Sequence, residues 1–231
     1  MKIQFLGTGG AFDVDYGNSS AIVDCGGTRF LVDCGHTVFP RLFHAGLLES
    51  IDAVLITHTH DDHVGSLSTL FFYYSLMLQK GKLKIIVPND AFHKTLSDFL
   101  VFAVQTPETR LDFVPISNYP QLGAIDTFGQ HVAGMPTWAY TFREGQERMV
   151  YSGDNGDVPA LFKHLPGLGL EGAMVFHEIF WWPGFKGHAY YKDLEAYMDR
   201  YLIRGYHCDP RLAPADNKVP LVASFAELLF P

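Results

Sequence analysis

The residues best suited to chemistry in this sequence stand together in one segment, His58-Thr59-His60-Asp61-Asp62-His63. His58 and His60 are two positions apart, so in an extended segment both imidazoles point to the same side. Asp62 and His63 follow where the chain should turn towards a helix. Two imidazoles and an adjacent imidazole–carboxylate pair are suitable ligands for two neighbouring metal ions. A hydrophobic strand, predicted for residues 53–56, leads into this segment and favours a functional site over a loop of solvated histidines.

Three further candidates occur in the second half of the chain. Asp154 lies in Ser152-Gly153-Asp154-Asn155-Gly156, His188 follows Gly187, and His207 follows a short predicted strand. Each has a plain structural alternative, namely a turn for Asp154, a polar residue before a helix for His188 and a core histidine for His207. Together with the upstream cluster, these side chains favour the functional interpretation.

Short elements of both kinds must position these residues. The patterns predict strands at 3–6, 20–24, 29–33, 53–56, 83–87, 111–114, 125–128, 138–142, 149–151 and 172–176. They predict helices at 38–48, 67–78, 91–104, 159–164 and 192–202, and the chain closes with short segments at 205–207 and 219–225. Neither a linker nor a low-complexity segment interrupts the pattern. We therefore predict one α/β domain over residues 1–231, with two sheets and helices outside.

Composition excludes several classes of protein. The chain has 231 residues, 48% of them hydrophobic, which is enough to bury a sizeable core. Its formal charge of −8 argues against a general binder of nucleic-acid backbone. The longest strongly apolar run, residues 70–78, is too short to span a membrane, and the first residues lack a signal-peptide pattern. Three cysteines without a CxxC spacing fit the cytoplasm.

The order of these motifs resembles the metallo-β-lactamase superfamily. HxHxDH follows a hydrophobic strand, residues 6–10 resemble the superfamily's opening strand and glycine turn, and residues 18–20 and 30–35 resemble its first hairpin. Tyr151-Ser152-Gly153-Asp154 resembles the segment with the aspartate that bridges two metals. The resemblance covers nearly the whole chain and implies an αββα four-layer sandwich with the metal site at one sheet edge. The metal ligands that it implies are His58, His60, Asp62, His63, Asp154 and His207.

Within this superfamily, the chain is most similar to ribonuclease Z and related phosphodiesterases. His177-Glu178-Ile179-Phe180 resembles the His-Glu-Ala-Thr segment of that branch, and Gly187-His188-Ala189 resembles its Gly-His-Ser, whose histidine donates a proton. Residues 206–211 resemble the Thr-His-Ile-Ser-Pro-Arg segment that holds the last metal ligand. The resemblance implies that Asp62 ligates one ion and orients the attacking water, and that His188 protonates the leaving oxygen. Glu178 would hold His188 or a ligand histidine in the required tautomer.

The sequence departs from this pattern at the third histidine of the first metal. That histidine normally precedes a Pro-Ser-x-x-Tyr stretch, here residues 136–140, and the aligned position holds Ala133. His131 lies two residues earlier, and a bulge near a neighbouring glycine (Gly129 or Gly134) would bring it into the site. His36, His177 or water are the alternatives. We favour His131.

The substrate predicted from the sequence is small. Between His131 and Asp154 there is no room for the long arm with which ribonuclease Z enzymes process transfer RNA, and the chain is acidic. Both features make long nucleic acid an unfavourable partner. Trp181 and Trp182 lie between Glu178 and His188, where two indoles could stack on a nucleobase, with packing as an equally good explanation.

The leading hypothesis is therefore a binuclear, metal-dependent phosphodiesterase acting on a small nucleotide-like diester, with a cyclic nucleotide as the leading candidate. Ribonuclease Z-type RNA processing and lactam or thioester hydrolysis are alternatives. A degenerate nucleotide-binding protein of the same fold is another, and Ala133 is its main support. We expect two divalent ions per chain, with Zn the first candidate and Mn the second. The resemblance also implies a homodimer, without any membrane partner.

Overall fold

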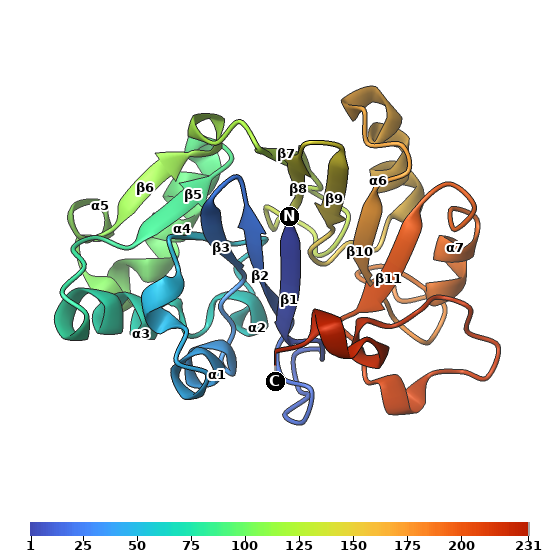
Figure 1. Cartoon of the computed structure of the whole chain (residues 1–231), viewed down its shortest axis with the longest axis horizontal. Coiled ribbons are helices and arrows are strands. Elements are labelled where there is room, and N and C mark those ends of the chain that lie inside the picture. Colours follow the sequence, from blue (N-terminus) through green and yellow to red (C-terminus); the bar gives the residue numbers. More distant parts are fainter. Residues whose placement is uncertain (231) are drawn as a thin grey trace.

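The computed structural model describes residues 1–230 as two β-sheets with helices on their outer sides (Figure 1). The first sheet has the order β1-β2-β3-β4-β5-β6 and the second has the order β11-β10-β9-β8-β7. The strands of the first sheet are β1 (Lys2–Gly7), β2 (Ser20–Cys25), β3 (Thr28–Val32), β4 (Ala53–Leu55), β5 (Lys84–Val87) and β6 (Asp112–Pro115). Those of the second are β7 (Leu122–Asp126), β8 (Trp138–Glu144), β9 (Glu147–Tyr151), β10 (Met174–Glu178) and β11 (Leu202–Tyr206).

Local sequence explains most of these strands. Gly26 and Gly27 have φ angles of 59° and 76°, which allow the two-residue turn between β2 and β3. β3, β4, β5 and β6 run parallel to one another, and every residue of β4 is buried. Continuous apolar runs are typical of parallel strands that are covered on both faces.

Helices cover the outer side of each sheet. The α-helices are α1 (Val38–His44), α2 (Asp61–Val64), α3 (Leu67–Phe72), α4 (Asp90–Val104), α5 (Pro107–Arg110), α6 (Val158–His164) and α7 (Tyr191–Glu195). Short helices of other types are η1 (Leu48–Ser50), η2 (Tyr73–Met77), η3 (Ile116–Asn118), η4 (Pro166–Leu168), η5 (Pro210–Leu212), η6 (Val222–Ser224) and η7 (Ala226–Leu228). Side-chain caps fix the first residues of α4 and α6, since Asn89 accepts from the Phe92 amide at 2.8 Å and Asp157 from the Ala160 amide at 3.0 Å.

Aromatic side chains fill the space between the sheets. Phe5 of β1 contacts Phe176 of β10 and Tyr206 of β11, with ring centroids 5.2 and 5.6 Å apart. Tyr151 of β9 packs on Tyr206 at 4.8 Å. All four are buried, so this layer joins the two sheets beneath the loops that follow β4, β9 and β11.

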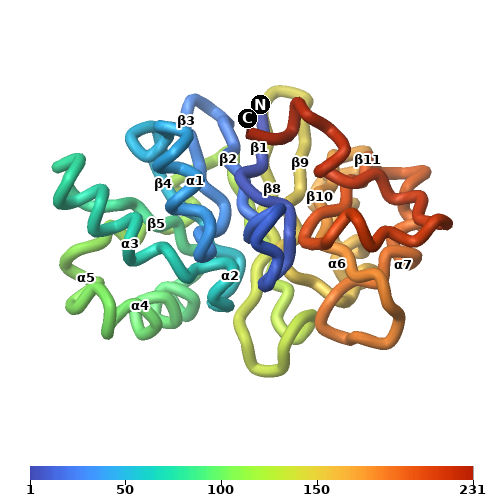
Figure 2. The backbone as a smooth tube through the Cα atoms, turned by 90° about the horizontal axis from the view of Figure 1, so that it is seen from below, coloured from blue at the N-terminus to red at the C-terminus, as the bar shows by residue number. Residues whose placement is uncertain are grey.

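Those loops bring the candidate residues to one edge of the sandwich. β9, β10 and β11 run parallel, so their carboxyl ends meet, and the carboxyl end of β4 faces them from the first sheet. Polar side chains that follow such strand ends commonly form binding sites. Figure 2 views the molecule from below, where the yellow-green connection between β7 and β8 projects at the centre, between α2 and the orange connection from β10 to α7.

The helix predicted for residues 192–202 is wrong in extent. α7 ends at Glu195, residues 196–201 form turns and a bend, and β11 begins at Leu202. The Leu202 amide donates to the Ala173 carbonyl at 3.1 Å, so strand pairing with β10 outweighs the helical pattern. Tyr197 still packs inward, stacked on Phe162 at 4.2 Å. The predicted helix at 67–78 is divided into α3 and the π-helical η2.

Within residues 1–230, no helix has the length and apolarity needed to cross a membrane.

Candidate metal centre

The structure brings all seven proposed metal ligands together at the edge where the strands end. One group contains His58, His60, His131 and Asp154. A second contains Asp62, His63 and His207. Within each group the ligand atoms lie within 4.8 Å of one another. As predicted, His58 and His60 follow β4 in extended chain, whereas Asp62 and His63 lie in the first turn of α2.

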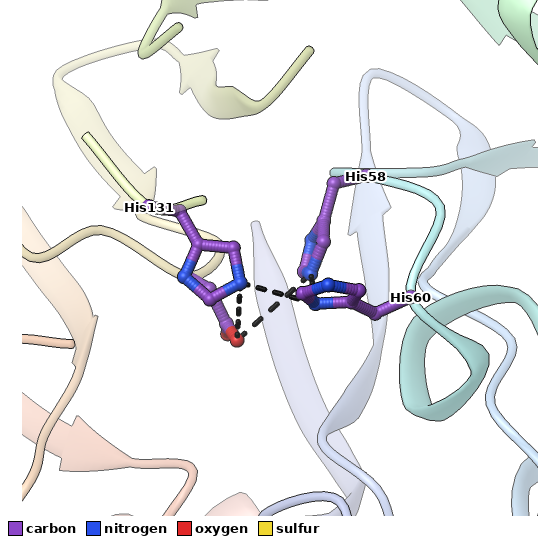
Figure 3. A group of neighbouring side chains, drawn as sticks. His58, His60 and His131 are labelled. Atoms are coloured by element: carbon purple, nitrogen blue, oxygen red, sulfur yellow. Dashed lines mark hydrogen bonds and ion pairs between the residues drawn. The ribbon is translucent and has the colours of Figure 1, made fainter. Parts of the chain in front are cut away.

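Three imidazoles converge in the first group (Figure 3). Nδ1 of His60 lies 3.0 Å from Nε2 of His58 and 3.0 Å from Nε2 of His131. Burial lowers the pKa of His58 and His60, and the neighbouring imidazoles lower it further. These two rings are therefore neutral, which is the form of histidine that binds metal.

His131 reaches this group from the loop between β7 and β8. The loop is closed by the Thr127 amide, which donates to the Thr137 carbonyl at 3.0 Å. Nδ1 of His131 donates to the Gly187 carbonyl, so Nε2 is left with its lone pair facing the other imidazoles. Ala133 is exposed. The loop places His131 beside the other imidazoles, whereas the sequence analysis expected a bulge near Gly129 or Gly134 to bring it there.

The alternative histidines lie elsewhere. His177 is buried, and its Nδ1 donates to the Glu178 carbonyl at 2.7 Å while its ring stacks on Phe162. His36 has a largely exposed side chain whose Nε2 lies 3.8 Å from Asp61. Neither histidine belongs to a ligand group.

Asp154 faces both groups, one with each carboxylate oxygen. Its Oδ1 lies 3.3 Å from Nε2 of His63 and 3.6 Å from Nε2 of His207. Its Oδ2 lies 3.9 Å from Nε2 of His58 and 3.8 Å from Nε2 of His131. This is the arrangement that a carboxylate bridging two ions requires.

Carboxylate charge is maintained in the second group. Oδ2 of Asp62 lies 3.3 Å from Nε2 of His63 and 3.2 Å from Nε2 of His207. Burial alone would raise the pKa of Asp62 and Asp154, but contacts with His63 and His207 outweigh it and hold both below their usual range. Both side chains are therefore anionic acceptors.

The residues present fit divalent cations. Nε2 of His63 and Oδ1 of Asp154 are buried without a hydrogen-bond partner, an arrangement that costs about 1–3 kcal/mol per group unless a ligand satisfies it. Around a tetrahedral ion with bonds of 2.0–2.2 Å, ligand atoms lie about 3.3 Å apart. The observed separations of 3.2 to 3.9 Å around Asp154 and Asp62 agree with that spacing.

Asp33 is a site residue that the sequence analysis missed. It follows β3 and is fully buried, with Oδ2 accepting from Nδ1 of His63 at 2.8 Å. Oδ1 accepts from the Thr57 amide at 2.7 Å, which links it to the segment leading into His58. Because His63 donates through Nδ1, its Nε2 is directed to the second group. The available signal was a carboxylate at the end of the strand predicted for residues 29–33.

Close backbone contact fixes α2 beside Asp33. The Cys34 amide donates to the His63 carbonyl at 2.7 Å. A Cβ atom on Gly35 would lie 1.9 Å from the carbonyl oxygen of Asp62, so a glycine is required there. The segment after β3 therefore sets the position of two candidate ligands.

Glu178 contacts His188, which resolves one alternative left open by the sequence. Glu178 ends β10 and is fully buried; its Oε1 accepts from the Ala189 amide at 2.7 Å and the Asn155 amide at 3.1 Å. Its Oε2 lies 3.2 Å from Nδ1 of His188. Burial alone would lower the pKa of His188, but Glu178 and then Asp154 outweigh it and raise the pKa to about 9.

A cavity of about 940 Å³ opens onto both ligand groups and is lined by Asp62, Asp154 and His188 among others. Trp181 and Trp182 lie just outside it and line an adjoining cavity. Trp181 is buried, and its indole N–H donates to the Asp209 carbonyl at 2.9 Å. Trp182 is half exposed. A stacking role for the two indoles stays a prediction.

The fold and the clustered donors define a metal-dependent hydrolase of the metallo-β-lactamase fold. Human tRNase Z, short form, superposes with a TM-score of 0.69 at 21% identity, covering 96% of each chain. The metallo-β-lactamase fold protein YhfI from Bacillus subtilis superposes with a TM-score of 0.69 at 20% identity, covering 93% of this chain and 89% of its own.

A family model described as Anti-Pycsar protein Apyc1 matches residues 1–217. The Anti-Pycsar protein Apyc1 of Bacillus phage BSP38 is 30% identical over 199 residues, 77% of this chain and 76% of its own. The chain belongs to the Anti-Pycsar protein Apyc1 family.

These findings confirm the predicted superfamily and fold class. The family match also confirms a metal-dependent phosphodiesterase that acts on a nucleotide-like substrate, and the ligand groups agree with binding of divalent metal. The single-domain boundaries and the individual roles of the site residues stay predictions.

Proposed function

We propose that the chain opens a cyclic nucleotide to the linear nucleoside monophosphate at a centre of two divalent cations. The observation that supports this most strongly is the position of Asp154, whose two oxygens face two separate ligand groups. His188 lies beside it, with Nδ1 3.7 Å from Oδ2 of Asp154. Family membership supports the same chemistry.

In this proposal, His58, His60, His131 and Asp154 hold one cation, and Asp62, His63, His207 and Asp154 hold the other. Two bound cations neutralise phosphoryl charge and lower the pKa of a water. We take Zn as the first candidate and Mn as the second, because imidazole and carboxylate donors suit both. Asp33 positions His63 through Nδ1, and the Gly187 carbonyl positions His131 in the same way.

His188 supplies the proton for the leaving group. Hydrolysis forms one new bond from the water oxygen to phosphorus and breaks the bond from phosphorus to one sugar oxygen. That sugar oxygen requires a proton, which the His188 imidazolium donates while Glu178 stabilises its charge. The raised pKa keeps His188 protonated at neutral pH.

A small substrate agrees with the surroundings of the site. The loop from β7 to β8 spans residues 127–137 only, so it cannot form the long arm of enzymes that process transfer RNA. The net charge of −8 disfavours a long polyanion. The His188–Glu178 pair favours a phosphodiester over a lactam or thioester, and the position of His131 weighs against a degenerate binding protein.

The test is hydrolysis of 3′,5′-cyclic nucleotides by the purified, metal-loaded protein, followed by chromatography of the linear product. The wild type and Asp98→Asn, an exposed change on α4, should turn over alike. Asp154→Asn should lose turnover by at least about a thousandfold, because both ligand groups depend on it. Equal turnover by Asp154→Asn and wild type would refute the proposal.

We also propose a cytoplasmic location and a homodimer. The location is supported by Cys25, Cys34 and Cys208, which are buried free thiols. The dimer is supported by the resemblance to the ribonuclease Z branch, and sedimentation velocity will measure it.

A further inference from the structure

A second cavity, of about 370 Å³, adjoins the cavity over the ligand groups. The two cavities share five lining residues, namely Ala11, Phe12, Phe185, His188 and His207. Phe12 and Phe185 come from distant segments, the connection after β1 and the connection before α7. The second cavity is therefore a continuous extension of the first, and His188 stands where they meet.

Phe12 is a large apolar side chain held out in solvent by an ordered loop. It is 98% exposed, so it contributes little to the stability of the core. The backbone on either side is fixed, since the Gly9 amide donates to the Gly17 carbonyl at 2.8 Å and the Asp13 amide to the Gly10 carbonyl at 3.2 Å. Asp13 also accepts from the Tyr16 amide at 2.9 Å. The phenyl ring is thus presented at the junction by its loop.

Three further aromatic side chains, Phe180, Trp182 and Phe185, line the second cavity. The ring of Phe180 lies 5.2 Å from Trp182 and 5.2 Å from Phe185. Phe185 lies nearly parallel to His188, with an interplanar angle of 12° and centroids 5.4 Å apart. Phe185 and Trp182 are each about half exposed, so apolar ring area faces the cavity and remains available to a planar ligand.

The two cavities differ in the charged groups that line them. Within residues 1–230, the second cavity has Asp13 and Asp209 among its lining residues and no lysine or arginine. A phosphodiester anion is repelled there, whereas the first cavity offers the groups that bind cations. A ligand that occupies both cavities must therefore place its anion over Asp154 and an uncharged, planar part in the second cavity.

The position of His188 fixes the order of these parts. In the proposed reaction His188 protonates a sugar oxygen, so the sugar lies at the junction of the two cavities. The base is attached to the side of the sugar away from the phosphorus, and the second cavity, which Phe12 lines, offers the space on that side. We infer that the second cavity is the nucleobase subsite and that Phe12 is the residue that stacks on the base. This inference rests on the proposed function and adds a substrate-binding residue to it.

The test compares Phe12→Ala with the wild type on two substrates, a 3′,5′-cyclic nucleotide and the abasic 3′,5′-cyclic ribose phosphate. Loss of a stacked base should raise KM for the nucleotide about 5- to 150-fold. The kcat for the nucleotide, and kcat/KM for the abasic diester, should stay within about twofold. Phe12→Trp should restore KM, because any aromatic face can stack. Phe102→Ala is the matched control, since Phe102 is 94% exposed on α4 and lines neither cavity.

Binding of the free nucleoside gives a readout without turnover. Trp181 and Trp182 line the second cavity, so nucleoside binding should quench tryptophan emission, and Phe12→Ala should weaken that binding by the same factor. Equal effects of Phe12→Ala on the nucleotide and the abasic diester, or no effect on either, would overturn the subsite. Absence of cyclic-nucleotide hydrolysis by the wild type, with nucleoside binding still dependent on Phe12, would instead overturn the proposed function and leave the base subsite standing.

Discussion

Replacing Glu178 with Gln should move the alkaline limb of the pH profile of kcat to lower pH. In the wild type, the hydrogen bond and the charge of Glu178 are the two largest contributions that raise the pKa of His188, ahead of the charge of Asp154. The rise from 6.5 to about 9 corresponds to about 3 kcal/mol of preference for the imidazolium. Glutamine keeps an oxygen for the Ala189 and Asn155 amides but removes the charge.

The expected magnitude follows from these values. With a pKa of about 9, about nine-tenths of His188 is protonated at pH 8. With the contribution of Glu178 lost, burial is opposed by the charge of Asp154 alone, so the pKa of His188 falls towards its ordinary value of 6.5 and only a minor fraction of the ring is protonated at pH 8. Activity that needs the protonated ring is retained below the pKa and lost above it. Glu178→Gln should therefore reduce kcat about tenfold at pH 8, with a smaller loss at pH 6.

The assay is kcat from pH 5 to pH 10 for the wild type, Glu178→Gln and Glu171→Gln, an exposed control. All three proteins are loaded with the same cation, and the measured quantity is the displacement of the alkaline limb between them. His188→Gln should lack the limb altogether. A Glu178→Gln profile with uniformly lower kcat and an unmoved limb would refute the link between Glu178 and the protonation of His188.

Three further changes test the site. Asp33→Asn removes the charged acceptor that positions the imidazole of His63. It should weaken metal binding about 10- to 100-fold, measured by competition with a chromophoric chelator. An unchanged metal affinity would contradict the positioning role of Asp33. His131→Ala should lower the metal content by one ion per chain, as measured by elemental analysis, and a content equal to wild type would exclude it as a ligand. Gly35→Ala should lower the free energy of unfolding, measured in urea, by at least about 2 kcal/mol, because the new Cβ would lie 1.9 Å from the Asp62 carbonyl oxygen. Gly167→Ala is the control and should leave the free energy of unfolding unchanged, because the space around Gly167 is open.

Much of the site was predictable because its determinants are local in sequence. The apolar run of β4 leads into His58 and His60, and Asp61 begins α2, so strand, ligands and helix follow one another within a dozen residues. The Gly26-Gly27 turn fixes the first hairpin in the same way. Such patterns depend on backbone preference and burial, which a sequence shows directly.

The features that the sequence did not predict depend on contacts between distant segments. His131 enters the site because its loop closes on Thr137 and its ring bonds to Gly187, and no periodicity in the sequence encodes either contact. Asp33 acts through His63, thirty residues further on. The turn-rich stretch before Leu202 has a helical pattern, but pairing of β11 with β10 determines the structure there. Tertiary contacts of this kind outweigh local propensity.

The most direct test of the account is the metal content of the purified protein, measured by elemental analysis after dialysis and reloading with Zn or Mn. Two ligand groups that share Asp154 predict two ions per chain in the wild type and loss of both cyclic-nucleotide hydrolysis and tight metal binding in Asp154→Asn. One ion or none in the reloaded wild type, or two ions retained by Asp154→Asn, would contradict the shared centre.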